Sequence, residues 1–406
     1  SIKNRVPMSK LVLILNCGSS SLKFAILDPA TGEEKLSGLA EAFYLPEARI
    51  KWKINGEKGS ADLGAGAAHT EALNFIASNI MTDELKNSIT SIGHRIVHGG
   101  EKYTQSVVVT DEVVKGIEDA AQFAPLHNPA NLIGIRACQA HMPGVPMVAV
   151  FDTAFHQTMP DKAYTYAIPY EYYENYKIRR YGFHGTSHSF VSKRLAELIG
   201  RDIKDTKLIV CHLGNGSSIT AVDGGKSVDT SMGFTPLDGV IMGTRCGSID
   251  PNVVPYLMKK ENLTPDEMTE VMNKKSGFLG ISGASSDARD LDALANSGDQ
   301  RAKLALKMLT YGIIKYIGQF AAVMNGVDLI IFTGGIGEHN SRLRRRVCEN
   351  FSYLGLKFDY EANVAWGEDT IISLPDSKVK VALITTDEEI VIARDTMHIV
   401  QSEEEN

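Results

Sequence analysis

The strongest constraint on the fold is a strand–turn–strand segment that occurs twice. The first copy spans residues 11–26, where two apolar runs flank the polar turn 16–21. The second copy spans residues 208–222, and the two superpose when Gly18-Ser19-Ser20 is aligned with Gly216-Ser217-Ser218. Short apolar runs around glycine and serine turns are typical of β-hairpins. The pattern therefore predicts a duplicated chain in which each half begins with a hairpin of the same design.

Helical and strand patterns alternate through most of the length, which predicts an α/β fold built on a largely buried sheet. The chain has 406 residues, which is long for one hydrophobic core and suggests two or three domains, of which we expect two. Further strands are predicted at 328–333 and 379–384, and helices at 111–123, 300–324, 341–347 and 388–396. The helix at 300–324 is long and apolar enough to lie between domains or subunits.

Composition excludes several classes of protein. The formal net charge of -7 gives no basic field for binding nucleic acid or an anionic membrane surface. The five cysteines form no CxxC pair, as expected for reduced thiols in the cytoplasm. No apolar run is long enough for a membrane span and the start has no secretion signal, so we expect a cytoplasmic protein. Residues 1–7 are expected to lie outside the fold.

Three glycine-rich turns are candidates for binding phosphate. Backbone N–H groups and small hydroxyls in such turns form a concave anion site that no Cβ atom crowds. Besides the two hairpin turns, Gly334-Gly335-Ile336-Gly337-Glu338 follows a predicted strand. Gly225-Lys226-Ser227 resembles the end of a P-loop, but Thr220 stands where the first glycine is needed. A single turn of this kind is commonly just the connection of a hairpin. The occurrence of two matched turns and a third glycine segment favours a polyphosphate site.

Three arginines stand among small residues in the sequence: Arg95, Arg245 and Arg289. A guanidinium fork suits carboxylate or phosphate oxygens, so these side chains are candidates for binding anions. A solvated ion pair is the alternative interpretation for each of them.

Other ionisable residues are candidates for chemistry. Asp152 follows an apolar strand, at the end of the strand where open α/β sheets bind ligands. His184 and His188 could be a metal pair, but the glycine after His184 and the lack of a glutamate between them favour an imidazole that stabilises an anionic transition state. Glu388 begins the last predicted helix and could hold Mg²⁺ or merely interact with the helix dipole.

Taken together, these motifs resemble the acetate kinase family from Leu11 to about Thr396. The strings that match are LNCGSSSLKF, GHRIVHGG, FDTAFH, YGFHGTSH, HLGNGSS, DTSMGFTPLDGVIMGTR, SSDAR and FTGGIGE. The resemblance implies the duplicated ribonuclease-H-like fold shared with sugar kinases, actin and Hsp70. It implies domains at 8–154 plus 386–406 and at 155–385, which bind ATP in the cleft between them, and a homodimer.

The resemblance also implies roles for individual residues. The catalytic residues would be Asp152, His184 and Arg245. The acetate site would be Arg95, with Val97, Leu126 and Pro236 as its apolar pocket. Mg²⁺, or Mn²⁺ in its place, would be held by Asn16 and Glu388. ATP or ADP would be bound by Lys23, His212, Leu213, Gly214, Asn215, Gly216, Asp287, Ala288, Arg289, Gly335, Ile336, Gly337, Glu338 and His339. Family members commonly have asparagine where this chain has His339.

The implied activity is reversible, Mg²⁺-dependent transfer of the ATP γ-phosphoryl group to acetate, which gives acetyl phosphate and ADP in one in-line step. A propionate or butyrate kinase would differ only in pocket volume, and one methylene is worth roughly 1–3 kcal/mol. A chaperone or filament protein of the same fold would have no obvious use for Arg95 and Arg245 in one cleft. A sugar kinase would need more polar side chains than the pocket of Val97, Leu126 and Pro236 offers.

Overall fold

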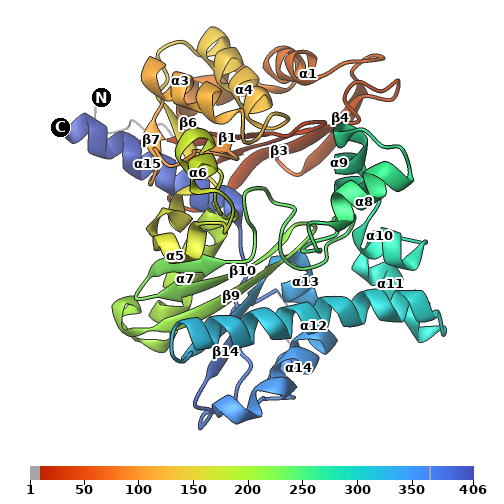
Figure 1. The fold of residues 1–406 in the computed structure, drawn as a ribbon. Coiled ribbons are helices and arrows are strands. Elements are labelled where there is room, and N and C mark those ends of the chain that lie inside the picture. Colours follow the sequence, from red (N-terminus) through yellow and green to blue (C-terminus); the bar gives the residue numbers. More distant parts are fainter. Residues whose placement is uncertain (1–9, 365–366) are drawn as a thin grey trace. The chain divides into compact units, whose positions relative to one another are not determined.

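Each of the two repeated hairpins begins a β-sheet, and the two sheets belong to different units of the chain (Figure 1). The computed structural model describes residues 10–364 and 367–406, so the expectation for residues 1–7 lies outside the described part. Unit 1 runs to Ala154 and includes Asp387–Asn406, whereas unit 2 is Phe155–Thr386. We describe each unit by itself.

The sheet of unit 1 has eight strands in the order β5-β4-β3-β2-β1-β6-β8-β7. The strands are β1 (Leu11–Cys17), β2 (Leu22–Leu27), β3 (Glu34–Glu41), β4 (Arg49–Ile54), β5 (Glu57–Asp62), β6 (Ile89–Ile96), β7 (Val107–Val108) and β8 (Met147–Phe151). Strand β1 pairs antiparallel with β2 and parallel with β6, which in turn pairs parallel with β8. The carboxyl ends of β1, β6 and β8 therefore lie at one edge of the sheet.

Helices cover both faces of this sheet. They are α1 (His69–Phe75), α2 (Asp83–Ser88), α3 (Asp111–Ala120), α4 (Asn128–His141) and α15 (Glu388–Glu405), with a π-helical turn at Ile76–Ile80. Alternate residues of β1 point to opposite faces: Leu13 packs in the core with α4, and Ile14 packs with Ile392 of α15. This period of two is why a strand buried on both sides reads as a continuous apolar run.

The sheet of unit 2 has six strands in the order β11-β10-β9-β12-β14-β13. They are β9 (Lys207–Leu213), β10 (Ser217–Asp223), β11 (Lys226–Thr230), β12 (Leu329–Thr333), β13 (Thr370–Ile371) and β14 (Lys380–Leu383). The order β11-β10-β9-β12-β14 repeats the order β3-β2-β1-β6-β8 of unit 1, with the same antiparallel and parallel pairings. The predicted hairpins and the duplicated ribonuclease-H-like α/β fold are confirmed.

Unit 2 also has helices on both faces of its sheet. They are α5 (Asp161–Tyr164), α6 (Tyr170–Tyr176), α7 (Gly185–Ile199), α8 (Val253–Lys260), α9 (Pro265–Lys274), α10 (Gly277–Ser282), α11 (Ala288–Asn296), α12 (Gln300–Val323), α13 (Gly334–His339) and α14 (Ser341–Cys348). Ile209 of β9 lies in the core with α12, and its neighbour Val210 packs with Val191 of α7.

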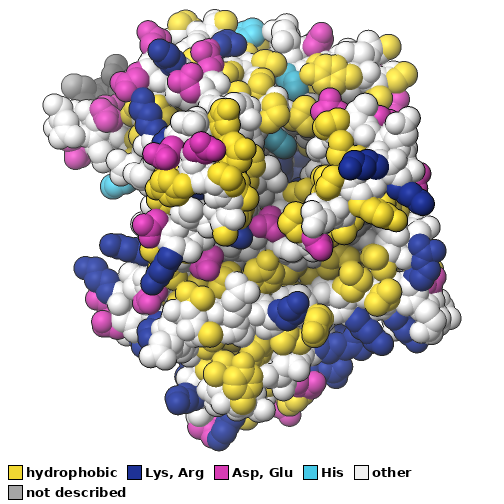
Figure 2. Space-filling view, viewed as in Figure 1, with side chains coloured by type: hydrophobic (Ala, Val, Ile, Leu, Met, Phe, Trp, Pro, Cys, Tyr) yellow, Lys and Arg dark blue, Asp and Glu magenta, His cyan; other side chains and the backbone are white. Residues whose placement is uncertain are grey.

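Two predicted helix ends are wrong. The helix predicted at 111–123 ends at Ala120, and tighter i→i−3 bonds take over through Ala124, where Pro125 disfavours helical backbone. The last helix continues past its predicted end to Glu405 because Val400 is still buried in the core. Within the described residues no helix is long and apolar enough to cross a membrane. On the face seen in Figure 2, side chains of both charges are interspersed.

Candidate active site

In unit 1, parallel pairing of β6 and β8 brings an arginine and an aspartate together. Ile96 pairs with Phe151, so Arg95 and Asp152 lie at the same edge of the sheet. Arg95 donates from Nε to Asp152 Oδ1 at 2.9 Å and from Nη2 to Oδ2 at 2.6 Å. This two-point contact is the geometry that a guanidinium fork and a carboxylate prefer. Asp152, predicted at the end of a strand, therefore has a charged partner.

Burial and charge act against each other at this pair. Asp152 is only 4% exposed, and burial raises the pKa of its carboxyl while the positive charge of Arg95 opposes the rise. The same contact raises the pKa of Arg95, so its guanidinium stays charged. Neither of the two hydrogen bonds uses Nη1 of Arg95. The ion pair therefore occupies Nε and Nη2 of Arg95, and Nη1 takes no part in it.

The predicted metal ligands lie in the same unit. Asn16 is near the end of β1, and Glu388 is the first residue of α15, which packs against β1, β6 and β8. The charge of Glu388 affects the pKa of both Arg95 and Asp152, so its carboxylate lies near that pair. No group of three or more His, Cys, Asp or Glu in the described chain could hold a metal. An amide oxygen and a carboxylate suit Mg²⁺, which completes its shell with water and phosphate oxygens.

Other predicted residues of unit 1 are placed as follows. Lys23 forms an ion pair with Glu389, with 3.5 Å between Nζ and Oε1. Val97 is buried directly after β6, where its N–H donates to Asn131 Oδ1 at 3.1 Å. Leu126 is 64% exposed in the turn before α4. Pro236 belongs to unit 2, so the apolar pocket that these residues would form stays a prediction.

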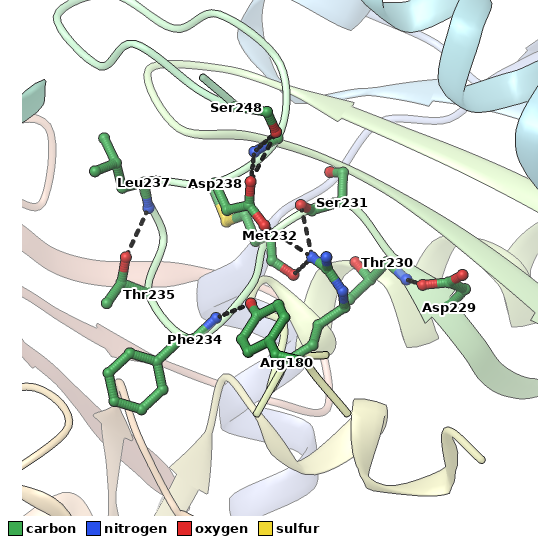
Figure 3. A network of polar contacts seen from close by, with 12 residues as sticks. Arg180, Asp229, Thr230, Ser231, Met232, Phe234, Thr235, Leu237, Asp238 and Ser248 are labelled. Atoms are coloured by element: carbon green, nitrogen blue, oxygen red, sulfur yellow. Dashed lines mark hydrogen bonds and ion pairs between the residues drawn. The ribbon is translucent and has the colours of Figure 1, made fainter. Parts of the chain in front are cut away.

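In unit 2, the loop 231–248 is fixed by a half-buried arginine that the sequence analysis did not single out. Arg180 donates from Nη1 to the carbonyls of Ser231 (3.1 Å) and Met232 (2.9 Å) and to Asp238 Oδ2 (3.1 Å) (Figure 3). Asp238 in turn accepts from Ser248 Oγ at 2.7 Å, which ties the far end of the loop to the same carboxylate. One guanidinium therefore fixes the loop that contains Pro236 and Arg245.

Arg245 has no acidic partner among the described residues. Its Nη1 donates to the carbonyl of Pro236 at 3.1 Å, and burial lowers its pKa. A methyl group built on Gly216 would lie 3.4 Å from Arg245 Nη1 and 3.3 Å from His184 Nε2. Arg245 Nη1 and His184 Nε2 therefore both lie beside the glycine turn between β9 and β10, where even a methyl group at Gly216 would be crowded. A half-buried guanidinium without a carboxylate is suited to an anionic ligand.

His184 belongs to a group of histidines and serines. It precedes α7 with a left-handed backbone (φ 58), which is uncommon for a residue other than glycine. Its ring stacks on His212 with 4.3 Å between centroids, and its Nδ1 lies 2.8 Å from Ser218 Oγ. His188 Nε2 lies 2.7 Å from the same oxygen. The two rings share a serine, which disfavours a zinc pair and favours the alternative interpretation of an imidazole hydrogen-bond donor.

A cavity of about 700 Å³ lies beside this turn within unit 2. Eight predicted nucleotide residues line it: Gly214, Asn215, Asp287, Ala288, Arg289, Gly335, Ile336 and His339. Seven lining residues were not predicted: Gly243, Phe278, Ser286, Asp292, Asn340, Ser341 and Arg342. The other nucleotide-binding residues predicted in this unit do not line it: His212, Leu213, Gly216, Gly337 and Glu338. The cavity is large enough for a small-molecule ligand.

The glycine segment at this cavity depends on close packing. Gly334 has φ 80, and a Cβ there would lie 2.6 Å from the carbonyl oxygen of Leu213. Arg344, predicted only as part of the helix at 341–347, is 1% exposed and donates from Nη1 to the carbonyls of Gly337 (2.8 Å) and Glu338 (2.9 Å). Its position three and four residues before Val347 and Cys348, which are buried on the same side of the helix, was the available signal. Arg344 thus stabilises the end of α13.

Asp287 and Arg289 pair with each other at the start of α11. Asp287 accepts from the Arg289 backbone N–H at 2.8 Å and from its Nη2 at 2.8 Å. The Arg289 side chain is 89% exposed, so the solvated ion pair is the interpretation that this structure supports for Arg289. These hydrogen bonds hold the pKa of Asp287 below its usual value.

Comparison with known proteins agrees with these motifs. The model of the acetokinase family matches residues 11–394. The chain belongs to the acetokinase family. It is 60% identical over 396 residues to the acetate kinase of Haemophilus influenzae strain PittGG, covering 96% of this chain and 99% of that protein. It is 54% identical over 397 residues to the acetate kinase of Actinobacillus pleuropneumoniae serotype 3, with coverage of 96% and 99%.

Solved structures give the same result for this acetokinase family member. The crystal structure of acetate kinase from Porphyromonas gingivalis aligns with a TM-score of 0.91 at 45% identity and covers 96% of this chain and all of that chain. A propionate kinase from Francisella tularensis aligns with a TM-score of 0.90 at 40% identity over the same shares. The fold is therefore common to kinases named for two different acids.

Proposed function

We propose that this chain is an acetate kinase, which transfers the γ-phosphoryl group of ATP reversibly to acetate. The observation on which the proposal chiefly rests is 60% identity to a protein of that name across 96% of the chain. Propionate is the alternative acceptor, because a structure of nearly equal similarity is named a propionate kinase. The substrate class, a short carboxylate, is the same in both cases.

The acceptor belongs to unit 1 in this proposal. Acetate is already ionised near pH 7, so no strong base is needed to activate it. Nη1 of Arg95 would bind one carboxylate oxygen, while Asp152 fixes the plane of the guanidinium through the other two donors. The task of this pair is to position the oxygen that attacks phosphorus, and positioning alone can supply several kcal/mol.

In this proposal, residues of unit 2 bind ATP and its transferring phosphoryl group. The nucleoside would occupy the 700 Å³ cavity, with the phosphates directed toward the turn at Gly216. Arg245 and the Nε2–H of His184 would donate to the equatorial oxygens of the group in flight. A bond forms from the acetate oxygen to the γ-phosphorus as the bond to the β,γ-bridging oxygen breaks, and ADP departs. Charge stabilisation of this kind is the main source of catalysis in phosphoryl transfer.

We also propose a divalent metal, Mg²⁺ or Mn²⁺, held by Asn16 and Glu388. When bound, it neutralises charge on the β- and γ-phosphate oxygens. The support is the chemistry of the two ligands, which are hard oxygen donors, and the place of Glu388 near Asp152.

A cytoplasmic homodimer remains part of the proposal. Leu304, Met308 and Tyr311 are exposed along α12, and hydrophobic side chains are visible over this helix in Figure 2. Exposed apolar side chains at i, i+4 and i+7 form one stripe of a helix, which suits a contact with a second copy.

Trapping of the product as a hydroxamate tests the proposal. ATP, Mg²⁺ and hydroxylamine are incubated with the protein and acetate, glucose or no acceptor. We expect acyl hydroxamate only with acetate. ADP release with glucose, or ATP binding without any product, would contradict the assignment and favour a sugar kinase or a chaperone-like protein respectively.

A further inference from the structure

We infer that His188, acting through the hydroxyl of Ser218, fixes His184 as the neutral tautomer that has its proton on Nε2. The inference rests on the proposed function and deepens it, because it assigns two positioning residues to a ring that would contact the phosphoryl group. His188 and Ser218 themselves do not reach that group.

The shared hydroxyl makes the two rings dependent on each other. Ser218 Oγ lies 2.8 Å from His184 Nδ1 and 2.7 Å from His188 Nε2, and both Ser218 and His188 are completely buried. A hydroxyl has one proton to donate. It could accept from both rings, but Ser218 Oγ has no other acceptor for its proton among the described residues, so the buried proton is satisfied only if the hydroxyl donates to one ring nitrogen and accepts from the other. His184 Nδ1 and His188 Nε2 therefore have opposite protonation states.

The surroundings of His188 determine which ring donates to Ser218 Oγ and which ring accepts from it. Nδ1 of His188 is buried and has no hydrogen-bond partner in the described part of the protein. A buried N–H group without an acceptor is rarer than an unpaired acceptor, so the proton of His188 belongs on Nε2. Burial, with the nearby rings of His156 and His212, lowers the pKa of His188, which keeps this ring neutral.

The remaining steps follow from the donor and acceptor roles. His188 Nε2–H donates to Ser218 Oγ, and Ser218 Oγ–H donates to His184 Nδ1. With Nδ1 as an acceptor, the single proton of a neutral His184 lies on Nε2. That nitrogen is the one beside the turn at Gly216 and near Arg245.

The opposite tautomer would be harmful at this position. A bare lone pair on Nε2 would face the negative oxygens of a phosphoryl group, whereas an N–H group donates to them. A charged His184 would require Ser218 to donate to His188 instead, and would leave a buried His188 N–H unpaired. The chain of two hydrogen bonds therefore selects the neutral donor form.

Nitrogen NMR of the full-length protein with ¹⁵N-labelled histidine tests the inference, because protonated and bare ring nitrogens have distinct shifts. The signals of His184 are identified as those lost in His184→Asn. We expect a bare Nδ1 and a protonated Nε2 in the wild type. Ser218→Ala and His188→Leu should give a mixture of tautomers. A protonated Nδ1 of His184 in the wild type would overturn the inference.

Kinetics provide the second readout. Ser218→Ala and His188→Leu should lower kcat by roughly 10- to 100-fold, the usual effect of removing a residue that orients a functional side chain, with little change in KM for ATP. His188→Gln should restore most of the loss, because its amide nitrogen can donate where Nε2 did. Ser192→Ala is the matched control: Ser192 is buried on the same helix and bonds only the His188 carbonyl at 2.7 Å.

The outcomes separate this inference from the proposed function. If the wild type has the expected tautomers but forms no acyl phosphate, the proposed function is contradicted and the inferred hydrogen bonds are supported. Acyl phosphate formation with an unchanged tautomer and unchanged kcat in Ser218→Ala would contradict the inference alone. If His188→Leu fails to fold, Ser218→Ala decides the matter.

Discussion

Replacing Arg344 by methionine should loosen the glycine segment of the 700 Å³ cavity, although Arg344 itself does not line that cavity. Methionine has a similar length but no donor, so four hydrogen bonds are lost. They run from Arg344 to the carbonyls of Gly337, Glu338 and Asn363 and to Asn363 Oδ1, at 2.8–3.0 Å. Each buried acceptor left unpaired costs about 1–3 kcal/mol, and such costs are not fully additive. We expect a loss of about 3–5 kcal/mol in local stability.

The assay for this prediction has to be local, because a chain of two units need not unfold in one step. Hydrogen exchange of the amides in α13 and α14 reports the free energy of local opening. Arg344→Met should speed exchange there and weaken ADP binding, while exchange in unit 1 is unchanged. Arg344→Lys should recover little, because an ammonium cannot reach both sides of the guanidinium fork. A change in opening free energy below about 1 kcal/mol would refute the argument.

Three other substitutions test the site. Arg245→Ala should lower kcat on the order of 10³-fold, as for other arginines that stabilise a transferring phosphoryl group, and a loss below tenfold would remove it from that role. Asp152→Asn should lower kcat/KM for acetate by about 10²-fold through misplacement of Arg95, and unchanged kinetics would contradict the positioning role of the pair. Arg180→Met should make the loop 231–248 more sensitive to limited proteolysis and lower kcat by about tenfold, whereas unchanged cleavage would show that the loop does not depend on this arginine.

Local patterns explain what the sequence could predict. The two hairpins depend on neighbouring residues, so apolar runs and glycine turns identified them and the duplication together. Asp152 was predicted at the end of a strand because the carboxyl ends of buried strands are where α/β sheets bind ligands. Its partner was not predictable from spacing, since Arg95 is 57 positions away and meets it only through the register of β6 and β8.

Other contacts between residues far apart in the sequence were missed for the same reason. Ser218 is 34 positions from His184 and 30 from His188, and only the packing of α7 against the sheet brings the three together. The residues around Arg180 and Arg344 in the sequence do not distinguish these two arginines from ordinary surface arginines. Their acceptors are mainly backbone carbonyls, which no sequence pattern identifies. Arg289 shows the converse case, since its favourable neighbours in sequence do not prevent an exposed ion pair.

The acceptor preference tests the central claim most directly. Acyl hydroxamate formation is measured with acetate, propionate and butyrate at a fixed, saturating concentration of ATP, and kcat/KM is compared among the three acids. The account predicts the highest value with acetate, lower by roughly tenfold or more for each added methylene. A higher kcat/KM with propionate or butyrate would contradict the assignment of acetate, and no product with any acid would contradict carboxylate phosphorylation altogether.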